Sequence, residues 1–247
     1  MSQTYQATHD LLQEEDMLNN FPIQPTANYK KATSCLNYSR QHKALYMLIG
    51  NNGFGKTSSI KHYAEKHPNI RYFRIGEKER PKAFFGRLIH QITSEKEMDL
   101  DLLLKNAYLD YLIDRVSYDI VDDTDIDLIV IDEFGNFTAR FIPILRQLWD
   151  NISPRIGMVL AGPPSILNDM RKWQKEEKRG INEIFSRVGH RIQFLKKPSL
   201  KDVEIICLSR DITDKKLISR FFKNNLMKDF RVLQNMITDF KNGVFNP

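Results

Sequence analysis

The chain has 247 residues, of which 41% are hydrophobic, 11% aromatic and 28% charged. This length suits one large domain or a core domain with a small appendage, and the composition supports a sizeable apolar core, so a long multidomain protein and a disordered chain are excluded. The net charge is +6, but residues 1–27 contain four acids and no Lys or Arg, so the remaining residues carry +10. Such an excess permits a polyanionic partner, yet it also occurs on proteins that never meet nucleic acid.

The sequence contains no signal for a membrane or a secretory route. No stretch approaches the roughly 18 uninterrupted apolar residues of a membrane-spanning helix, and the acidic N-terminus has no apolar segment of a signal peptide. Cys35 and Cys207 are isolated and lack the spacing of metal ligands. We therefore expect a cytoplasmic protein with two idle thiols and no membrane partner.

An acidic arm is expected at residues 1–27, because Pro22 and Pro25 end any helix that begins in it. After the arm, short β-rich runs alternate with helical patterns, which is typical of a parallel sheet with crossover helices. Five strands are predicted, at residues 44–49, 70–74, 127–131, 157–161 and 191–194. Between the second and third strands, apolar residues recur at helical spacing and predict two core-facing stripes: Phe84, Phe85, Leu88, Ile89 and Ile92, then Leu104, Ala107, Tyr108, Tyr111 and Leu112.

Beyond residue 197 the β pattern stops, and three helical segments follow, with breaks at residues 211–214 and 224–225. These segments predict a small helical lid at residues 198–247, behind an α/β domain at residues 28–197. The last helix places one apolar stripe at Phe230, Leu233, Met236, Ile237 and Phe240, with Arg231 beside it.

A phosphate-binding loop is predicted directly after the first strand. Residues 50–57 match the pattern G-x-x-x-x-G-K-S/T, in which glycines let backbone N–H groups curl around phosphates and the following helix points its N-terminus at the same anion. Lys56 is expected to reach the β- and γ-phosphate oxygens, and the Thr57 hydroxyl to ligate Mg²⁺. We expect the nucleotide to contact Gly50, Asn51, Asn52, Gly53, Phe54, Gly55, Lys56, Thr57 and Ser58.

The third predicted strand is apolar and delivers Asp132 and Glu133 at its carboxyl end. Beside a phosphate loop, this pattern indicates a metal-supporting Asp132 and a Glu133 that polarises the attacking water. An acidic turn that closes a core strand is the alternative, and it is common where such a pair occurs without a phosphate loop. The sequence thus predicts an ATPase that uses ATP and Mg²⁺. The acids at residues 119–127 are better read as a solvated loop than as a metal cluster.

Together these motifs resemble the AAA+ ATPases, over residues of about 28 to 240. The segments at 48–65, 131–134 and 159–164 are most similar to the target-selection ATPases of DNA transposition, whose type member is phage Mu transposition protein B. The order and spacing of the segments at 159–162, 166–173 and 185–192 are also similar to that group. The resemblance implies a five-stranded parallel sheet flanked by helices and a C-terminal helical lid.

The resemblance also implies further catalytic residues. Arg187, with Arg191 as the alternative, occupies the place of an arginine finger that contacts ATP on a neighbouring subunit, and Arg231 resembles the lid arginine that approaches the γ-phosphate. A helix-capping Arg187 and a solvated Arg231 are the structural alternatives. The fourth strand departs from the family, because Gly162 is followed by two prolines where a polar residue usually contacts the γ-phosphate. Slow or partner-gated hydrolysis would follow.

Contact with DNA is expected after the second strand. Lys78, Arg80 and Lys82 lie at the start of the next predicted helix, where backbone amides also attract phosphate. In the transposition ATPases this region resembles the lining of the central pore, although a solvated basic loop has the same composition. A DNA contact here would be made to phosphate and would carry little sequence preference.

The function that these features favour is an ATP-dependent, largely sequence-nonspecific DNA-binding regulator of transposition, which selects target DNA and recruits a transposase. Its subunits would assemble head-to-tail into rings or helical filaments. Two alternatives share the same ATPase core. One is a loader of a replicative helicase, and the other is a nucleotide-switched signalling or defence module that does not bind DNA.

Overall fold

The computed structural model describes residues 23–77, 79–92, 108–122 and 125–247. In these ranges the chain forms a five-stranded parallel sheet of order β2-β3-β4-β1-β5. The strands are β1 (Leu45–Ile49), β2 (Ile70–Arg74), β3 (Leu128–Asp132), β4 (Gly157–Gly162) and β5 (Ile192–Phe194). Each predicted strand is confirmed to within one residue at either end, and so is the predicted α/β fold class.

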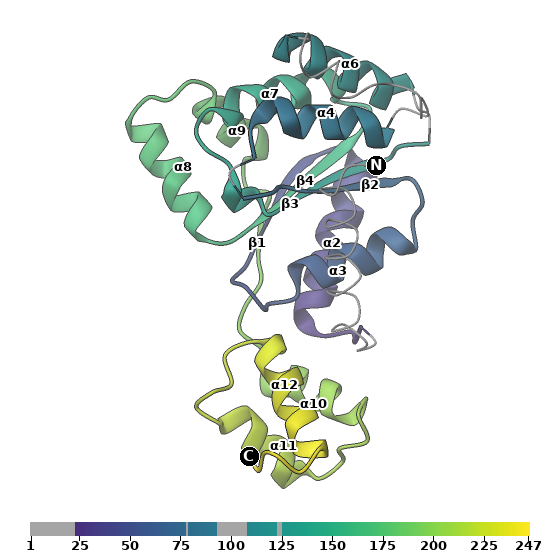
Figure 1. Cartoon of the computed structure of the whole chain (residues 1–247), viewed down its shortest axis with the longest axis vertical. Coiled ribbons are helices and arrows are strands. Elements are labelled where there is room, and N and C mark those ends of the chain that lie inside the picture. Colours follow the sequence, from purple (N-terminus) through teal and green to yellow (C-terminus); the bar gives the residue numbers. More distant parts are fainter. Residues whose placement is uncertain (1–22, 78, 93–107, 123–124) are drawn as a thin grey trace, which may run out of the picture.

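Helices cover both faces of the sheet (Figure 1). One face carries α2 (Ala27–His42) and α3 (Lys56–Glu65), and the other carries α4 (Pro81–Ile92), α6 (Leu109–Asp122), α7 (Phe141–Ile152), α8 (Ser165–Lys175) and α9 (Ile181–Val188). Successive side chains of a strand point to opposite faces. In β1, Met47 and Ile49 accordingly pack with the larger helical layer, whereas Leu48 packs with α2 and α3. Almost every residue of the three central strands is buried, as expected for a parallel sheet covered on both sides.

Helix α6 corrects one of the predicted core stripes. Tyr108 is 85% exposed and precedes the helix, and Tyr111 is 51% exposed. The buried stripe of this helix consists of Leu112, Ile113, Val116 and Ile120. The prediction placed the stripe one helical position too early, so only Leu112 belongs to both sets; Leu104 and Ala107 lie outside the described residues. The stripe predicted on α4 is confirmed at Phe84, Phe85 and Leu88.

Three C-terminal helices form a separate apolar cluster below the sheet in Figure 1. They are α10 (Leu200–Leu208), α11 (Lys215–Lys223) and α12 (Phe230–Lys241), and the breaks between them fall where the sequence predicts. Each begins with a side-chain cap, from Ser199, Asp214 and Asp229 respectively. We propose that these helices are the lid. Residues 1–22 of the proposed acidic arm lie outside the described residues.

Within the described ranges, none of the helices has both the length and the apolar character needed to cross a membrane.

Candidate functional site

The loop at residues 50–55 joins β1 to α3 and lies at the carboxyl end of the sheet. Gly53 and Gly55 have φ of 76° and 85°, which non-glycine residues rarely adopt. The Gly50 N–H donates to the Gly162 carbonyl oxygen over 3.1 Å, so the start of the loop is tied to the end of β4. This arrangement presents a curled backbone at the N-terminus of α3, which is a site for an anion.

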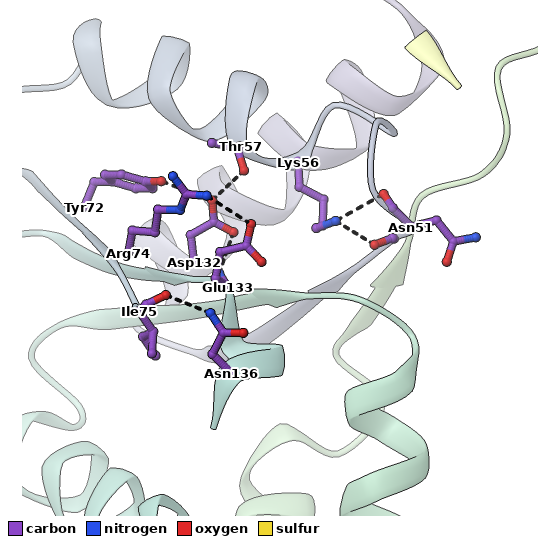
Figure 2. A network of polar contacts seen from close by, with 10 residues as sticks. Asn51, Lys56, Thr57, Tyr72, Arg74, Ile75, Asp132, Glu133 and Asn136 are labelled. Carbon is purple, nitrogen blue, oxygen red and sulfur yellow. Dashed lines mark hydrogen bonds and ion pairs between the residues drawn. The ribbon is translucent and has the colours of Figure 1, made fainter. Parts of the chain in front are cut away.

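Lys56 points back into this loop. Its Nζ donates to the carbonyl oxygens of Gly50 at 2.6 Å and of Asn51 at 3.2 Å, as Figure 2 shows. The side chain is buried, and burial lowers the pKa of Lys56, while Asp132 and Glu133 act in the opposite direction. A lysine held between backbone carbonyls at this position can exchange them for phosphate oxygens.

The two predicted metal ligands lie together. Thr57 Oγ1 donates to Asp132 Oδ2 over 2.7 Å, and the second oxygen of Asp132 accepts the Glu133 N–H at 2.8 Å. Asp132 is fully buried at the end of β3. Hydroxyl and carboxylate oxygens are the ligands that Mg²⁺ prefers, so this pair fits the ion.

Glu133 turns away from the end of β3. Its backbone adopts a left-handed conformation with φ of 57°, which costs a non-glycine residue on the order of 1–2 kcal/mol. The carboxylate is partly exposed, with Oε1 3.9 Å from a guanidinium nitrogen of Arg74. Strain of this kind is retained where the surrounding fold enforces it, commonly at functional positions. The partly exposed Glu133 carboxylate thus directly follows Asp132 of the Thr57–Asp132 pair.

The end of β4 explains the departure from the family pattern. A Cβ at Gly162 would come within 3.2 Å of the Gly135 nitrogen and 3.4 Å of Phe134 Cβ. The short helix η1 (Phe134–Asn136), which directly follows Glu133, therefore packs where a side chain at residue 162 would begin. At this position the strand end offers backbone and no polar side chain.

The lid contacts the phosphate loop directly. The Phe230 N–H, in the first turn of α12, donates to the Gly53 carbonyl oxygen at 3.0 Å. Arg231 follows it in the same turn, on the exposed side of the helix, and lies close enough for its charge to contribute to the lowered pKa of Lys56. The structure thus brings the predicted lid arginine to the loop.

Arg187 lies on α9 and is held by its own chain. Its Nε and a terminal nitrogen donate to the two carboxylate oxygens of Asp150, on α7, at 2.6 and 2.9 Å, and its other terminal nitrogen donates to the Glu183 carbonyl at 3.0 Å. The alternative finger, Arg191, donates to the backbone carbonyls of Leu45 and Arg187. Arg187 is thus bound to α7 and α9, and Arg191 to the start of β1 and to α9.

In the basic segment after β2, Glu79 holds the backbone and α4 together. Glu79 accepts the Gly76 N–H at 2.9 Å and pairs with Arg87 of α4 at 2.9 Å. Arg80 is exposed directly before α4, and Lys82 lies half-buried in its first turn. Lys78 lies outside the described residues. Two of the three predicted DNA contacts are thus placed at the N-terminus of a helix.

Three site residues have no motif in the sequence. Tyr72 and Arg74 of β2 share one face of the sheet with Asp132, because β2 pairs with β3 so that Arg74 lies opposite Asp132. The Tyr72 hydroxyl donates to Asp132 Oδ2 at 3.1 Å. Asn28, buried in the first turn of α2, donates its amide to the carbonyls of Phe54 at 3.1 Å and Lys196 at 2.7 Å. Only the sheet order and the position of α2 reveal these residues.

A family model described as AAA domain matches residues 39–170, more than half of the chain and all of the region from the phosphate loop to β4. No curated protein sequence matches the chain.

Several solved structures share the fold. The structure of the Aeropyrum pernix Orc1 protein in complex with DNA is 11% identical, with a TM-score of 0.57, and the match covers 86% of this chain and 58% of that one. The replication initiator DnaA, bound to AMPPCP and single-stranded DNA, is 14% identical, with a TM-score of 0.58 and coverages of 92% and 65%. A signal transduction ATPase with numerous domains from Pyrococcus horikoshii, with a tetratricopeptide repeat sensor, is 16% identical, with a TM-score of 0.51 and coverages of 87% and 32%. The chain therefore spans about a third to two-thirds of these proteins.

Proposed function

The chain belongs to the AAA domain family of P-loop ATPases, and from this premise we propose that it is an ATP-dependent, largely sequence-nonspecific DNA-binding regulator of DNA transposition. In this role it selects target DNA and recruits a transposase. The observation that carries the proposal is the grouping of Lys56, Thr57, Asp132 and Glu133 at one end of the sheet, in a chain whose motif order is similar to that of the transposition ATPases.

The nucleotide site works through the residues at the ends of β1 and β3. Lys56 releases its backbone carbonyls and binds the β- and γ-phosphates, and Glu133 orients the attacking water. Thr57 and Asp132 hold Mg²⁺, which would neutralise charge on the phosphates when bound. Arg231 joins from the lid, so closure of the lid and occupancy of the site favour each other.

Arg187 would act on a neighbouring subunit. Its hydrogen bonds lie on the α7–α9 side, whereas Lys56 lies at the phosphate loop. An arginine that completes the site of the next subunit requires a head-to-tail contact, and repeated head-to-tail contacts generate rings or helical filaments. Such an assembly would place one ATP at each junction.

DNA would bind across the assembled subunits through Lys78, Arg80 and Lys82. The exposed Arg80 at the start of α4 and the +10 charge outside the acidic arm support this proposal. Two of the structural neighbours, Orc1 and DnaA, were solved with DNA. Contacts to phosphate give affinity without sequence preference.

A signalling module is the second candidate. It is favoured by the similarity to a signal transduction ATPase and by the absence of a polar side chain at Gly162, which fits a protein that holds ATP longer than it hydrolyses it. Such a module would bind ATP in the same site but would not bind DNA.

Duplex DNA binding measured by fluorescence anisotropy, with and without a non-hydrolysable ATP analogue, tests the proposal. We expect binding that requires the analogue and is abolished in Lys56→Ala. The double variant Arg80→Ala/Lys82→Ala should bind more weakly and show a flatter salt dependence, by up to about 0.9 log–log units for each phosphate that is no longer neutralised. Its matched control is Lys215→Ala/Lys216→Ala, which removes two exposed charges at the start of the lid helix α11.

The control should bind like the unaltered protein. If the two double variants weaken DNA binding equally, the proposal that DNA contacts Arg80 and Lys82 is rejected. Nucleotide binding without any DNA binding at low salt would favour the signalling module.

A further inference from the structure

The carboxylate of Asp132 is the most enclosed acidic group in the site and accepts three hydrogen bonds. Two come from the nucleotide motifs themselves, the Thr57 hydroxyl at 2.7 Å and the Glu133 N–H at 2.8 Å. The third comes from Tyr72 on the neighbouring strand, at 3.1 Å, and it shares Oδ2 with Thr57 (Figure 2). Nothing in the phosphate loop or in the acidic pair of β3 requires this tyrosine.

Tyr72 is fixed both as a ring and as a hydrogen-bond donor. Its ring packs with the apolar cluster beneath α2 and α3, and its backbone is paired with β3 opposite Val130. Burial, reinforced by the neighbouring Asp132 carboxylate, raises the pKa of Tyr72 far above its ordinary value. In the structure the phenol hydroxyl donates its hydrogen bond to Asp132 Oδ2.

The shared oxygen matters for the metal site. Thr57 can offer an oxygen lone pair to Mg²⁺ while its own proton has an acceptor, and Asp132 Oδ2 is that acceptor in the structure. An oxygen that is held from a second direction cannot rotate away from Thr57 without breaking another hydrogen bond. Outer partners of this kind orient metal ligands, and their removal typically lowers metal affinity about 10- to 100-fold.

We propose that Tyr72 is a positioning residue of the metal site, which fixes the Asp132 carboxylate so that Thr57 and Asp132 together receive Mg²⁺. This inference rests on the proposed nucleotide function. It adds a residue from β2 to a site that the sequence builds only from the β1 loop and β3. Tyr72 acts in this proposal through its hydrogen bond to Asp132, so its effect should be confined to steps that need the ion.

The test uses the full chain with Tyr72→Phe, which keeps the ring and removes only the hydroxyl. The matched control is Tyr63→Phe, because Tyr63 is a buried tyrosine of the same apolar cluster, but its hydroxyl donates to Asn37, at 2.5 Å. Binding of a fluorescent non-hydrolysable ATP analogue is measured across a titration of MgCl₂ and again in EDTA. Electron paramagnetic resonance of added Mn²⁺ gives the metal affinity directly.

In Tyr72→Phe we expect the Mg²⁺ midpoint to rise about 10-fold, at the lower end of the range for outer partners of metal ligands, with weaker Mn²⁺ binding and unchanged affinity in EDTA. Tyr63→Phe should match the unaltered protein in all three measurements. An unchanged midpoint in Tyr72→Phe, or an equal loss of affinity in EDTA, overturns the inference while the nucleotide function stands. If the unaltered protein binds no analogue at any Mg²⁺ concentration, the proposed function fails and the inference fails with it.

Discussion

The contact between the lid and the phosphate loop predicts a specific cost for a methyl group at Gly53. With φ of 76°, Gly53 is in a conformation that costs alanine about 1–2 kcal/mol. An added Cβ would also lie 2.5 Å from Oδ1 and 2.8 Å from Cβ of Asp229, the residue that caps α12. Distances this short force Asp229 to move.

Moving Asp229 breaks the cap of the last lid helix. Its Oδ1 accepts the Val232 N–H at 3.0 Å, and removal of such a cap costs about 0.5–2 kcal/mol. We therefore expect Gly53→Ala to lower the free energy of unfolding of the nucleotide-free protein by about 1.5–4 kcal/mol, the backbone cost and the cap cost together.

Gly55 provides the matched control. Its φ of 85° gives alanine the same backbone cost, but the nearest atom to an added Cβ is 3.8 Å away, in the ring of Phe230. Gly55→Ala should therefore cost only about 1–2 kcal/mol. The comparison separates the strained backbone from the contact with the lid.

Urea unfolding of the two glycine variants, each alone and combined with Asp229→Ala, measures the coupling. Gly53→Ala and Asp229→Ala should together cost about 1 kcal/mol less than their sum, because the cap is removed only once and the clash with the carboxyl group of Asp229 is relieved, while the Cβ of residue 229 remains. The costs of Gly55→Ala and Asp229→Ala in unfolding free energy should be additive. If the costs are additive to within about 0.5 kcal/mol in both double variants, Asp229 of the lid does not contact Gly53 as the structure shows.

Lys56→Ala should abolish nucleotide binding, whereas Glu133→Gln should bind ATP normally and release phosphate about 10²- to 10⁴-fold more slowly; a wild-type rate in Glu133→Gln would remove it from the role of base. Arg187→Ala should lower ATP hydrolysis without changing nucleotide affinity, and mixing it with Glu133→Gln should restore some turnover. Asp150→Ala removes the same ion pair but keeps the arginine, so it should leave ATP hydrolysis unchanged. An equal drop in hydrolysis in Arg187→Ala and Asp150→Ala would indicate that Arg187 has a structural role. Burial raises the pKa of Cys207 from 9.0 to about 11, so at pH 8 its thiolate is about 100-fold scarcer than that of a free thiol. Its alkylation rate in the folded protein should keep rising from pH 9 to 11, and a plateau near pH 9 would contradict the burial.

The part of the site that the sequence predicts is the part that short segments dictate. The glycines of residues 50–55 and the apolar run that ends at Asp132 set the conformation of their own stretches, so loop, strand and acid follow from local rules. Tyr72 depends instead on β2 lying beside β3, and Asn28 makes its bonds to residues far along the chain. No spacing in the sequence encodes either neighbour.

The stripe on α6 was wrong for a related reason. Between residues 104 and 120 apolar and aromatic residues satisfy helical spacing in more than one phase, and the correct phase depends on which face meets α4 and α7. Tyrosine tolerates both environments, because its ring is apolar and its hydroxyl is polar. The aliphatic residues Ile113, Val116 and Ile120 were the better indicators of the buried face.

The ion pair between Arg187 and Asp150 bears on the proposed action between subunits. Each side chain is about a third exposed, at 29% and 37%, and pairs in such surroundings contribute up to about 1 kcal/mol. An arginine that stabilises phosphoryl transfer contributes a factor of about 10³ to 10⁵ in kcat, equivalent to roughly 4–7 kcal/mol. In the transition state of a docked neighbouring subunit, the gain from the arginine therefore exceeds the loss of the Asp150 ion pair. The same pair gives Arg187 a fixed position on α9 before assembly, so the arginine can be ordered in the monomer and still act in the oligomer.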